Sequence, residues 1–193
     1  MGAFSALDKM KIDLLHGGLG LLDPINLRII EGISQENQAL VILSREKSFV
    51  PPEDLLAGQT KITLNSTEGL KQGREICLFD LENGEVKTID SVQKDCVILS
   101  SPLRFSYLKE QSSLLFLRRI SFFFAEEKQT LMRKTNFSPA QPLLEEVASF
   151  DFEYEKAKNL VKLTLFLKNN KEKKYETSVF PKNTGLLSIS QAE

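Results

Sequence analysis

The chain has 193 residues, of which 41% are hydrophobic and 26% charged, so it can bury a core as a single globular domain over residues 1–193. Its formal net charge of −1 gives no electrostatic footprint for nucleic acid, and no run of about 18 apolar residues is present to cross a bilayer. Two cysteines are too few to indicate a redox compartment.

The first predicted element is an amphipathic helix within residues 3–18. Its apolar residues recur at helical spacing and predict helix over Phe4–Leu15. His16 and two glycines then end the helix, because Gly tolerates the positive φ that a helix C-terminus often needs. We expect the apolar stripe to pack on a sheet, and the alternative is a helix that faces a partner. The stripe consists of Phe4, Leu7, Met10 and Leu14.

A β-rich insertion of short strands and turns is predicted over residues 33–117. Asn83-Gly84 is its strongest two-residue hairpin signal, because this pair favours the positive φ of a type I′ turn. The strands predicted here are Ala39–Leu43, Lys61–Leu64, Ile76–Leu81, Val86–Val92 and Cys96–Leu99.

Cys77 and Cys96 fall in the first and third strands of one predicted meander. They can form a disulfide only if the meander curls closed and brings those strands together. Otherwise they are two buried free thiols. Both alternatives remain open from the sequence.

Residues 118–182 predict a terminal antiparallel sheet. A strand at Arg119–Phe124 is followed by a turn at Glu126–Gln129 and a second strand at Thr130–Arg133. Leu143–Val147 is predicted to form a short turn of helix that leads into the last strands.

The stretch Phe150–Val179 predicts two consecutive hairpins with a defined register. In each strand apolar and polar residues alternate, as expected when one face is buried. A four-residue turn at Lys156–Asn159 satisfies both faces at once, whereas a slip by one residue would oppose leucine to carboxylate. The resulting pairs are Phe150 with Leu165, Phe152 with Leu163, Glu153 with Lys162, and Tyr154 with Val161. After a turn at Asn169–Lys173, the third strand is expected to pair Tyr175 with Leu167, Thr177 with Leu165 and Val179 with Leu163.

Three aromatic residues are predicted on the face opposite the aliphatic one, namely Phe123, Phe166 and Phe180. Large apolar side chains on a face that otherwise carries Lys and Glu are expected to be covered by another part of the protein or by a partner. The cover is either the insertion or a loop of the same chain, or else a neighbouring subunit.

The sequence predicts no catalytic residue, no cofactor site and no metal site. His16 is the only histidine, and the glycines that follow it close a helix, whereas a phosphate cradle would open one. The carboxylates Asp151, Glu153 and Glu155 lie parallel along a strand, where calcium would need converging oxygens. The one basic cluster, Lys168–Lys174, lies at a hairpin tip and lacks the interleaved aromatic residues that would stack on bases.

The ordered set of elements resembles the soluble part of type IV pilins and of the related pseudopilins of type II secretion. Ala6–Gly18 (ALDKMKIDLLHGG) resembles the end of the pilin helix, where an aspartate precedes a glycine. Three later segments resemble PilW-like minor pilins: ISFFFAEEKQTLMRKT, with its Leu-x-Arg strand, QPLLEEVASFDFEYE, and VKLTLFLK together with YETSVFPKN. The likeness covers residues 119–183 and 3–18 and is poor between them.

This resemblance implies an α+β, pilin-like fold and a structural role without enzymatic activity. The implied partners are other pilin or pseudopilin subunits, and the implied location is the inner membrane, with the soluble part in the periplasm and later in a filament. The family also implies an apolar N-terminal membrane helix, so we expect Met1-Gly2 to mark a shortened chain. The candidate interface residues are Phe4, Leu7, Met10, Phe123, Phe166 and Phe180. The alternatives are a type II secretion pseudopilin and an adhesion module that binds through the Lys168–Lys174 tip.

Overall fold

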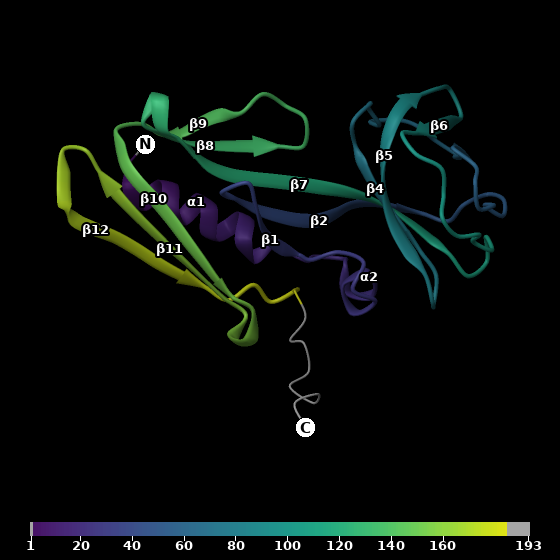
Figure 1. The fold of residues 1–193 in the computed structure, drawn as a ribbon, viewed down its shortest axis with the longest axis horizontal. Helices are drawn as coiled ribbons and strands as arrows, with labels where there is room; N and C mark the ends of the chain where they lie inside the picture. Colours follow the sequence, from purple (N-terminus) through teal and green to yellow (C-terminus); the bar gives the residue numbers. More distant parts are fainter. Residues whose placement is uncertain (1, 185–193) are drawn as a thin grey trace. The chain divides into compact units, whose positions relative to one another are not determined.

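The computed structural model describes residues 2–184, with the backbone alone at Lys171, and shows a mostly β protein of the α+β class (Figure 1). A short N-terminal helix packs against antiparallel sheets, as the sequence predicts. The helices are α1 (Ala3–Leu15) and α2 (Leu22–Asn26). The strands are β1 (Ile33–Glu36), β2 (Ala39–Phe49), β3 (Lys61–Thr63), β4 (Glu75–Phe79), β5 (Gly84–Val92), β6 (Cys96–Leu99), β7 (Ser113–Ala125), β8 (Thr130–Thr135), β9 (Gln141–Leu144), β10 (Val147–Glu155), β11 (Leu160–Leu167) and β12 (Asn170–Val179).

The chain divides into two compact units, each with its own core. Of the described residues, the first unit contains 2–22, 31–44 and 119–184, and the second contains 23–30 and 45–118. The insertion therefore starts at residue 45, whereas the sequence placed its start at 33. The reason is that Ile33, Leu40 and Ile42 are buried in the same core as α1.

Helix α1 is the centre of the first unit and packs against β9, β11 and β12. Its inner face carries Ala6, Leu7, Met10 and Leu14, all of which are buried. The helix ends at Leu15, short of residue 18, and turns follow. Gly18 has φ +74°, and a Cβ there would lie 2.2 Å from the carbonyl oxygen of Asn183, so only glycine fits this crossing.

Strands β10, β11 and β12 form a three-stranded antiparallel sheet in the first unit. The predicted β10–β11 register is confirmed, with Phe152 opposite Leu163 and Glu153 opposite Lys162. The β11–β12 register differs from the prediction by two residues, because Tyr175 lies opposite Leu165. The turn is shorter than expected, since Leu167 already pairs with Asn170, and a register irregularity follows between Phe166 and Leu167.

The remaining strands of the first unit belong to a second sheet. The predicted turn at Glu126–Gln129 is confirmed, with Ala125 opposite Thr130. The helical turn predicted at Leu143–Val147 is wrong, because β9 occupies part of it and pairs with β8. Leu143 and Leu144 reach the core from an extended backbone. The predicted terminal sheet is therefore split, since β7 to β9 and β10 to β12 lie in different sheets.

The second unit is built from short antiparallel strands in the order β4, β5, β6, β3. The hairpin around Asn83-Gly84 exists, but its turn is Asp80–Asn83, since Phe79 pairs with Gly84. The Asp80 carboxylate accepts hydrogen bonds from the backbone N–H groups of Glu82 and Asn83 at 2.8 and 2.7 Å, and this local turn displaces the predicted one.

Candidate subunit interfaces

The outer face of helix α1 carries exposed apolar residues among the exposed charged residues Asp8 and Lys11, in addition to the buried inner face. Phe4, Ile12 and Leu15 are 65%, 51% and 36% exposed. Leu7 and Met10, in contrast, are 2% and 0% exposed, so as interface candidates they are corrected to core residues. The sequence stripe combined residues of both faces, because Phe4 lies one helical turn before Leu7 but leans outward onto Tyr175, with ring centroids 5.3 Å apart.

A buried ion pair fixes α1 to β8. The Asp13 carboxylate is 4% exposed and accepts a hydrogen bond from Nε of Arg133 at 2.8 Å. Arg133 also donates to the hydroxyl of Thr135 at 2.9 Å. A charge this buried is stable only when it is paired, so the pair fixes how the helix is rotated against the strand.

The segment after β12 closes over the end of α1. The side-chain amide of Asn183 donates to the carbonyl oxygen of Leu15 at 3.1 Å. The Thr184 hydroxyl donates to the side-chain oxygen of Asn159 at 2.6 Å, and Asn159 in turn donates to the carbonyl oxygen of Pro181. Residues 181–184 therefore join the helix end to the β10–β11 turn.

The three aromatic residues predicted to share one face lie in different places. Phe123 is half-buried on β7, in one sheet, whereas Phe166 is half-buried on β11, in the other. Phe180 follows β12 and is 62% exposed. The expectation of one covered face is wrong because it assumed that all these strands form a single sheet.

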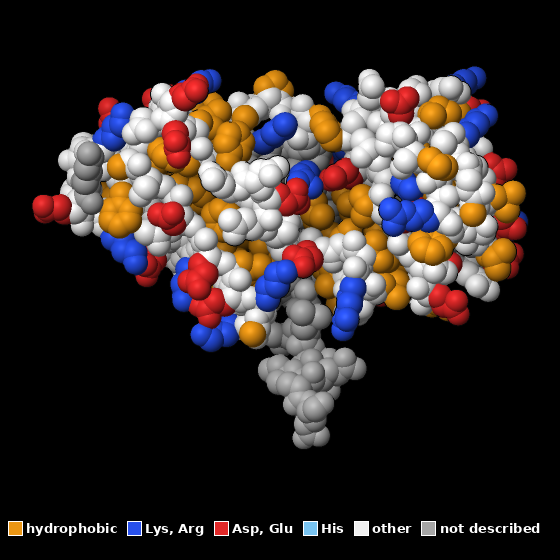
Figure 2. Space-filling model, viewed as in Figure 1, with side chains coloured by type: hydrophobic (Ala, Val, Ile, Leu, Met, Phe, Trp, Pro, Cys, Tyr) orange, Lys and Arg blue, Asp and Glu red, His pale blue; other side chains and the backbone are white. Residues whose placement is uncertain are grey.

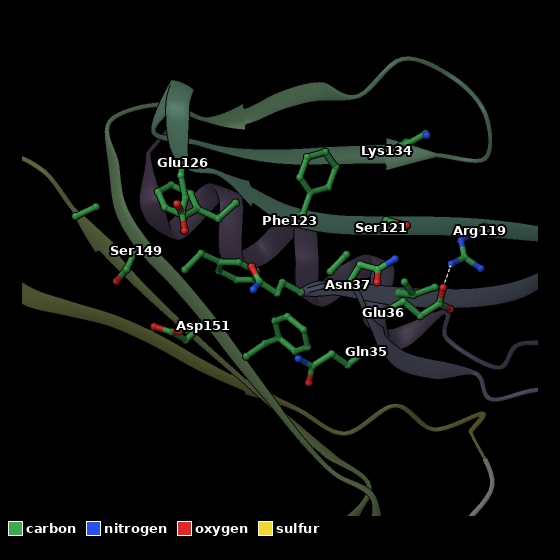
Figure 3. Close-up of a pocket in the computed structure, with 17 residues that line it drawn as sticks. Gln35, Glu36, Asn37, Arg119, Ser121, Phe123, Glu126, Lys134, Ser149 and Asp151 are labelled. Atoms are coloured by element: carbon green, nitrogen blue, oxygen red, sulfur yellow. Dashed lines mark hydrogen bonds and ion pairs between the residues drawn. The ribbon is translucent and has the colours of Figure 1, made fainter.

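An open groove of about 750 Å³ lies in the first unit, and Figure 3 shows residues that line it. Phe123, Ser121 and Arg119 reach it from β7, and Ser149 and Asp151 reach it from β10. The tip of the β1–β2 hairpin contributes Gln35, Glu36 and Asn37, and an ion pair joins Glu36 to Arg119. Sequence reasoning missed this groove because its walls come from separate sheets.

The residues considered for chemistry have local structural roles. Nδ1 of His16 lies 2.8 Å from the carbonyl oxygen of Ile12, at the end of the helix. Hydrogen bonds from Lys158 and Lys162 lower the pKa of Glu155 to about 2. The nearby Glu153 carboxylate lies 3.6 Å from Nζ of Lys162. In residues 2–184 no cluster of three or more His, Cys, Asp or Glu side chains has the arrangement of a metal site.

The second unit contains a buried polar network that the alternation pattern does not indicate. Glu85 and Lys87 share the inward face of β5 and are 6% and 7% exposed, with an ion pair of 2.9 Å between them. The Glu85 carboxylate also accepts hydrogen bonds from the backbone N–H groups of Arg104 and Phe105 and from the hydroxyl of Tyr107. Burial acts to raise the pKa of Glu85, but the hydrogen bonds and the charge of Lys87 outweigh it and lower the pKa.

This network keeps the Tyr107 phenol protonated and holds the loop that contains it in place. Burial, and next the negative charge of Glu85, raise the pKa of the Tyr107 phenol. Lys87 donates to the carbonyl oxygen of Pro102 at 2.6 Å. The result is that residues 101–107 are fixed on β5.

Cys77 and Cys96 are free and buried. They lie on β4 and β6, and β5 separates these strands in the sheet. Two strand spacings amount to about 10 Å, beyond the Cα separation that a disulfide spans. The sequence left open a disulfide or two buried free thiols, and the structure contains the free thiols.

Charges of both signs are interspersed over the face in Figure 2, in line with the net charge of −1. At the β11–β12 hairpin tip, Lys174 pairs with Glu176, and Nζ of Lys173 lies 5.0 Å from the ring centroid of Tyr175. Within the described residues, no helix combines the length and apolar character required to span a bilayer.

The fold defines the class of this protein as mostly β, with a helix packed on antiparallel sheets and with exposed apolar surface on that helix. No protein-family model matches the chain, and a search of curated protein sequences also finds no match.

Proposed function

We propose that this chain is a structural subunit of a type IV pilus-like filament, a minor pilin that acts in filament assembly or initiation. Its partners are other pilin-type subunits, and it works without catalysis. The observation that carries the proposal is the outer face of α1, where Phe4, Ile12 and Leu15 remain exposed although the inner face is buried in the core. These exposed apolar side chains lie on a helix whose inner face is already buried, so they are available to pack against a second partner.

Contacts between the segments that resemble pilins support this proposal. Asp13, from the helix end, pairs with Arg133, from the Leu-x-Arg strand. Asn183, from the last segment, hydrogen-bonds to Leu15. Segments that were compared separately along the sequence therefore meet in one unit, around one helix.

In the proposed filament, the inner membrane holds the subunit before assembly, and the soluble part lies in the periplasm. Reading the gene upstream of Ala3 tests this part of the proposal. A basic leader followed by about 20 apolar residues is expected there. An upstream segment without that pattern would exclude the membrane-held form.

The direct test is a charge on the outer face of α1 in the full-length protein. Ile12→Lys is expected to reduce cross-linking to partner pilin subunits at least tenfold, because it places an ammonium group in an apolar contact. Its melting temperature should stay close to that of the wild type, since Ile12 is 51% exposed. The matched control is Leu81→Lys, at a leucine that is 83% exposed in the second unit. Equal loss in both variants, or loss in neither, contradicts the proposal.

A pseudopilin of type II secretion is the alternative within the same class, because it would use the same helix face. The two systems are distinguished by which subunits cross-link to α1, those of a pilus or those of a secretion apparatus. The adhesion alternative has less support, since Lys173 and Lys174 at the hairpin tip already interact with Tyr175 and Glu176.

A further inference from the structure

Strand β10 is paired on one side only. Its neighbour is β11, and within residues 2–184 no strand pairs with its other edge. An edge strand points every second pair of backbone N–H and C=O groups away from its partner. At the start of β10 the backbone N–H of Val147 donates to the carbonyl oxygen of Gln129 at 2.9 Å. Beyond Val147 the free edge presents donors and acceptors that no other strand of the described chain pairs, and such groups bind another extended polypeptide.

The groove in Figure 3 lies along this free edge. Five consecutive β10 residues, Ala148 to Phe152, line it, and no residue of β11 does. Successive strand residues point to opposite faces, so a cavity that contacts five in a row faces the edge of the strand. Its volume of about 750 Å³ is in the range of ordinary ligand sites, about 300–1,000 Å³. Phe123 and Phe124 form part of the opposite wall.

The other edge strands of the described residues are short or protected. β1, β3 and β9 have four, three and four residues, and β9 contains Pro142. β12 is long but carries Lys173 and Lys174, and lysines on an edge oppose pairing. β10 has nine residues with neither proline nor lysine, and its register irregularity lies at its start, between Val147 and Ser149. The regular stretch Ser149–Glu155 is therefore the edge best suited to accept a strand.

The side chains of β10 define which strand fits. Asp151 and Glu153 lie on one face of β10, and on β11 the residue opposite Glu153 is Lys162. A strand on the free edge meets the same carboxylates, so Lys or Arg at alternate positions is favoured there. Its other side chains meet Phe150, Phe152 and Phe123, which favours apolar residues. A second copy of β10 is disfavoured, because antiparallel pairing would place the two acidic rows together.

We propose that the free edge of β10 binds an extended segment of another protein by strand addition, and that this segment alternates apolar residues with Lys or Arg. This surface is separate from the outer face of α1. The inference rests on β10 and its groove, so its test is independent of the test of the filament proposal.

The test uses the full chain, labelled with ¹⁵N, and a capped synthetic peptide of sequence KVTVKVTVK. We expect the peptide to slow hydrogen exchange at least tenfold for the alternate amides of Ala148–Tyr154 that point away from β11, because the added strand bonds protect those amides. A peptide methylated at alternate backbone nitrogens keeps its side chains but loses the hydrogen bonds, and should bind at least tenfold more weakly. Replacing its lysines by glutamates should weaken binding to a similar extent.

A matched pair of protein variants locates the site. Phe123→Lys adds a positive charge to the groove wall and should reduce peptide affinity at least tenfold, whereas Phe137→Lys, at a 55% exposed phenylalanine outside the groove, should leave it unchanged. The melting temperature of each variant shows that it is folded. The proposal is overturned by any of four results: no binding at millimolar peptide, equal binding of the methylated peptide, protection centred on β12, or self-association of the chain through β10.

Discussion

Asp13 and Arg133 join two segments that are 120 residues apart in the chain. Asp13→Asn removes the carboxylate charge and leaves the guanidinium group without its partner. We expect the free energy of unfolding to fall by about 3 kcal/mol, as when one member of a buried pair is removed. Chemical denaturation with urea measures this change.

The control for this prediction replaces both partners. Asp13→Leu combined with Arg133→Met should cost less than the sum of the two single changes, because neither charge is then left unpaired. Strictly additive costs would show that the two side chains act independently.

Cys77 is expected to be unreactive in the folded protein. Burial raises the pKa of its thiol to about 12, so the reactive thiolate is scarce at neutral pH. Mass spectrometry after treatment with iodoacetamide should show no modification of Cys77 in native buffer. In denaturant without reductant, both Cys77 and Cys96 should be modified, since both are free thiols. A mass 2 Da low and resistant to alkylation would instead indicate a disulfide.

At the scale of elements, the buried Glu85 on β5 should make the stability of the second unit sensitive to acid. The pKa of Glu85 is lowered in the folded chain from its ordinary value of 4.5, so its ionised form contributes stability above that value and loses it as the pH falls further. The free energy of unfolding should therefore drop as the pH falls below about 4.5.

Glu85→Gln should cost about 3 kcal/mol at pH 7, because Lys87 is then buried without its carboxylate. The variant should also lose part of the pH dependence of the wild type. Glu82→Gln, at an exposed position of the preceding turn, is the matched control and should change neither quantity. An unchanged pH profile in Glu85→Gln would contradict the assignment.

The register of a strand can be predicted from the sequence where both faces of the strand restrict which residues can lie opposite. The β10–β11 register follows from alternation, because Phe152 and Glu153 each require a different partner on β11. The register of β12 against β11 cannot be predicted in this way, because a shift by two residues keeps the same face of β12 inward. The length of the turn determines this register instead. On β5 alternation would mislead, because the inward residues are charged and Val86 is 37% exposed.

At the scale of the molecule, the candidate site is less predictable than the elements. The outer face of α1 needs a structure, because only packing shows that Phe4, which the sequence places in the buried stripe, is exposed together with Ile12. The groove can also be recognised only in a structure, since β7 and β10 belong to different sheets. The spacing of residues in the sequence does not show that these two strands face each other. Strand patterns determine what pairs locally, whereas interfaces depend on which sheet each strand joins.

The hydrogen bond from Asn183 to Leu15 spans 168 residues and has a consequence for the order of folding. The inner face of α1 is covered in part by β11 and β12, which are synthesised long after the helix. Since contacts at such sequence separation form slowly, the apolar side chains of α1 leave the ribosome well before the strands that shield them. A nascent chain that stops after Glu155 therefore lacks two of the strands that cover this helix, and the inner face of the helix is incompletely shielded from water during that interval.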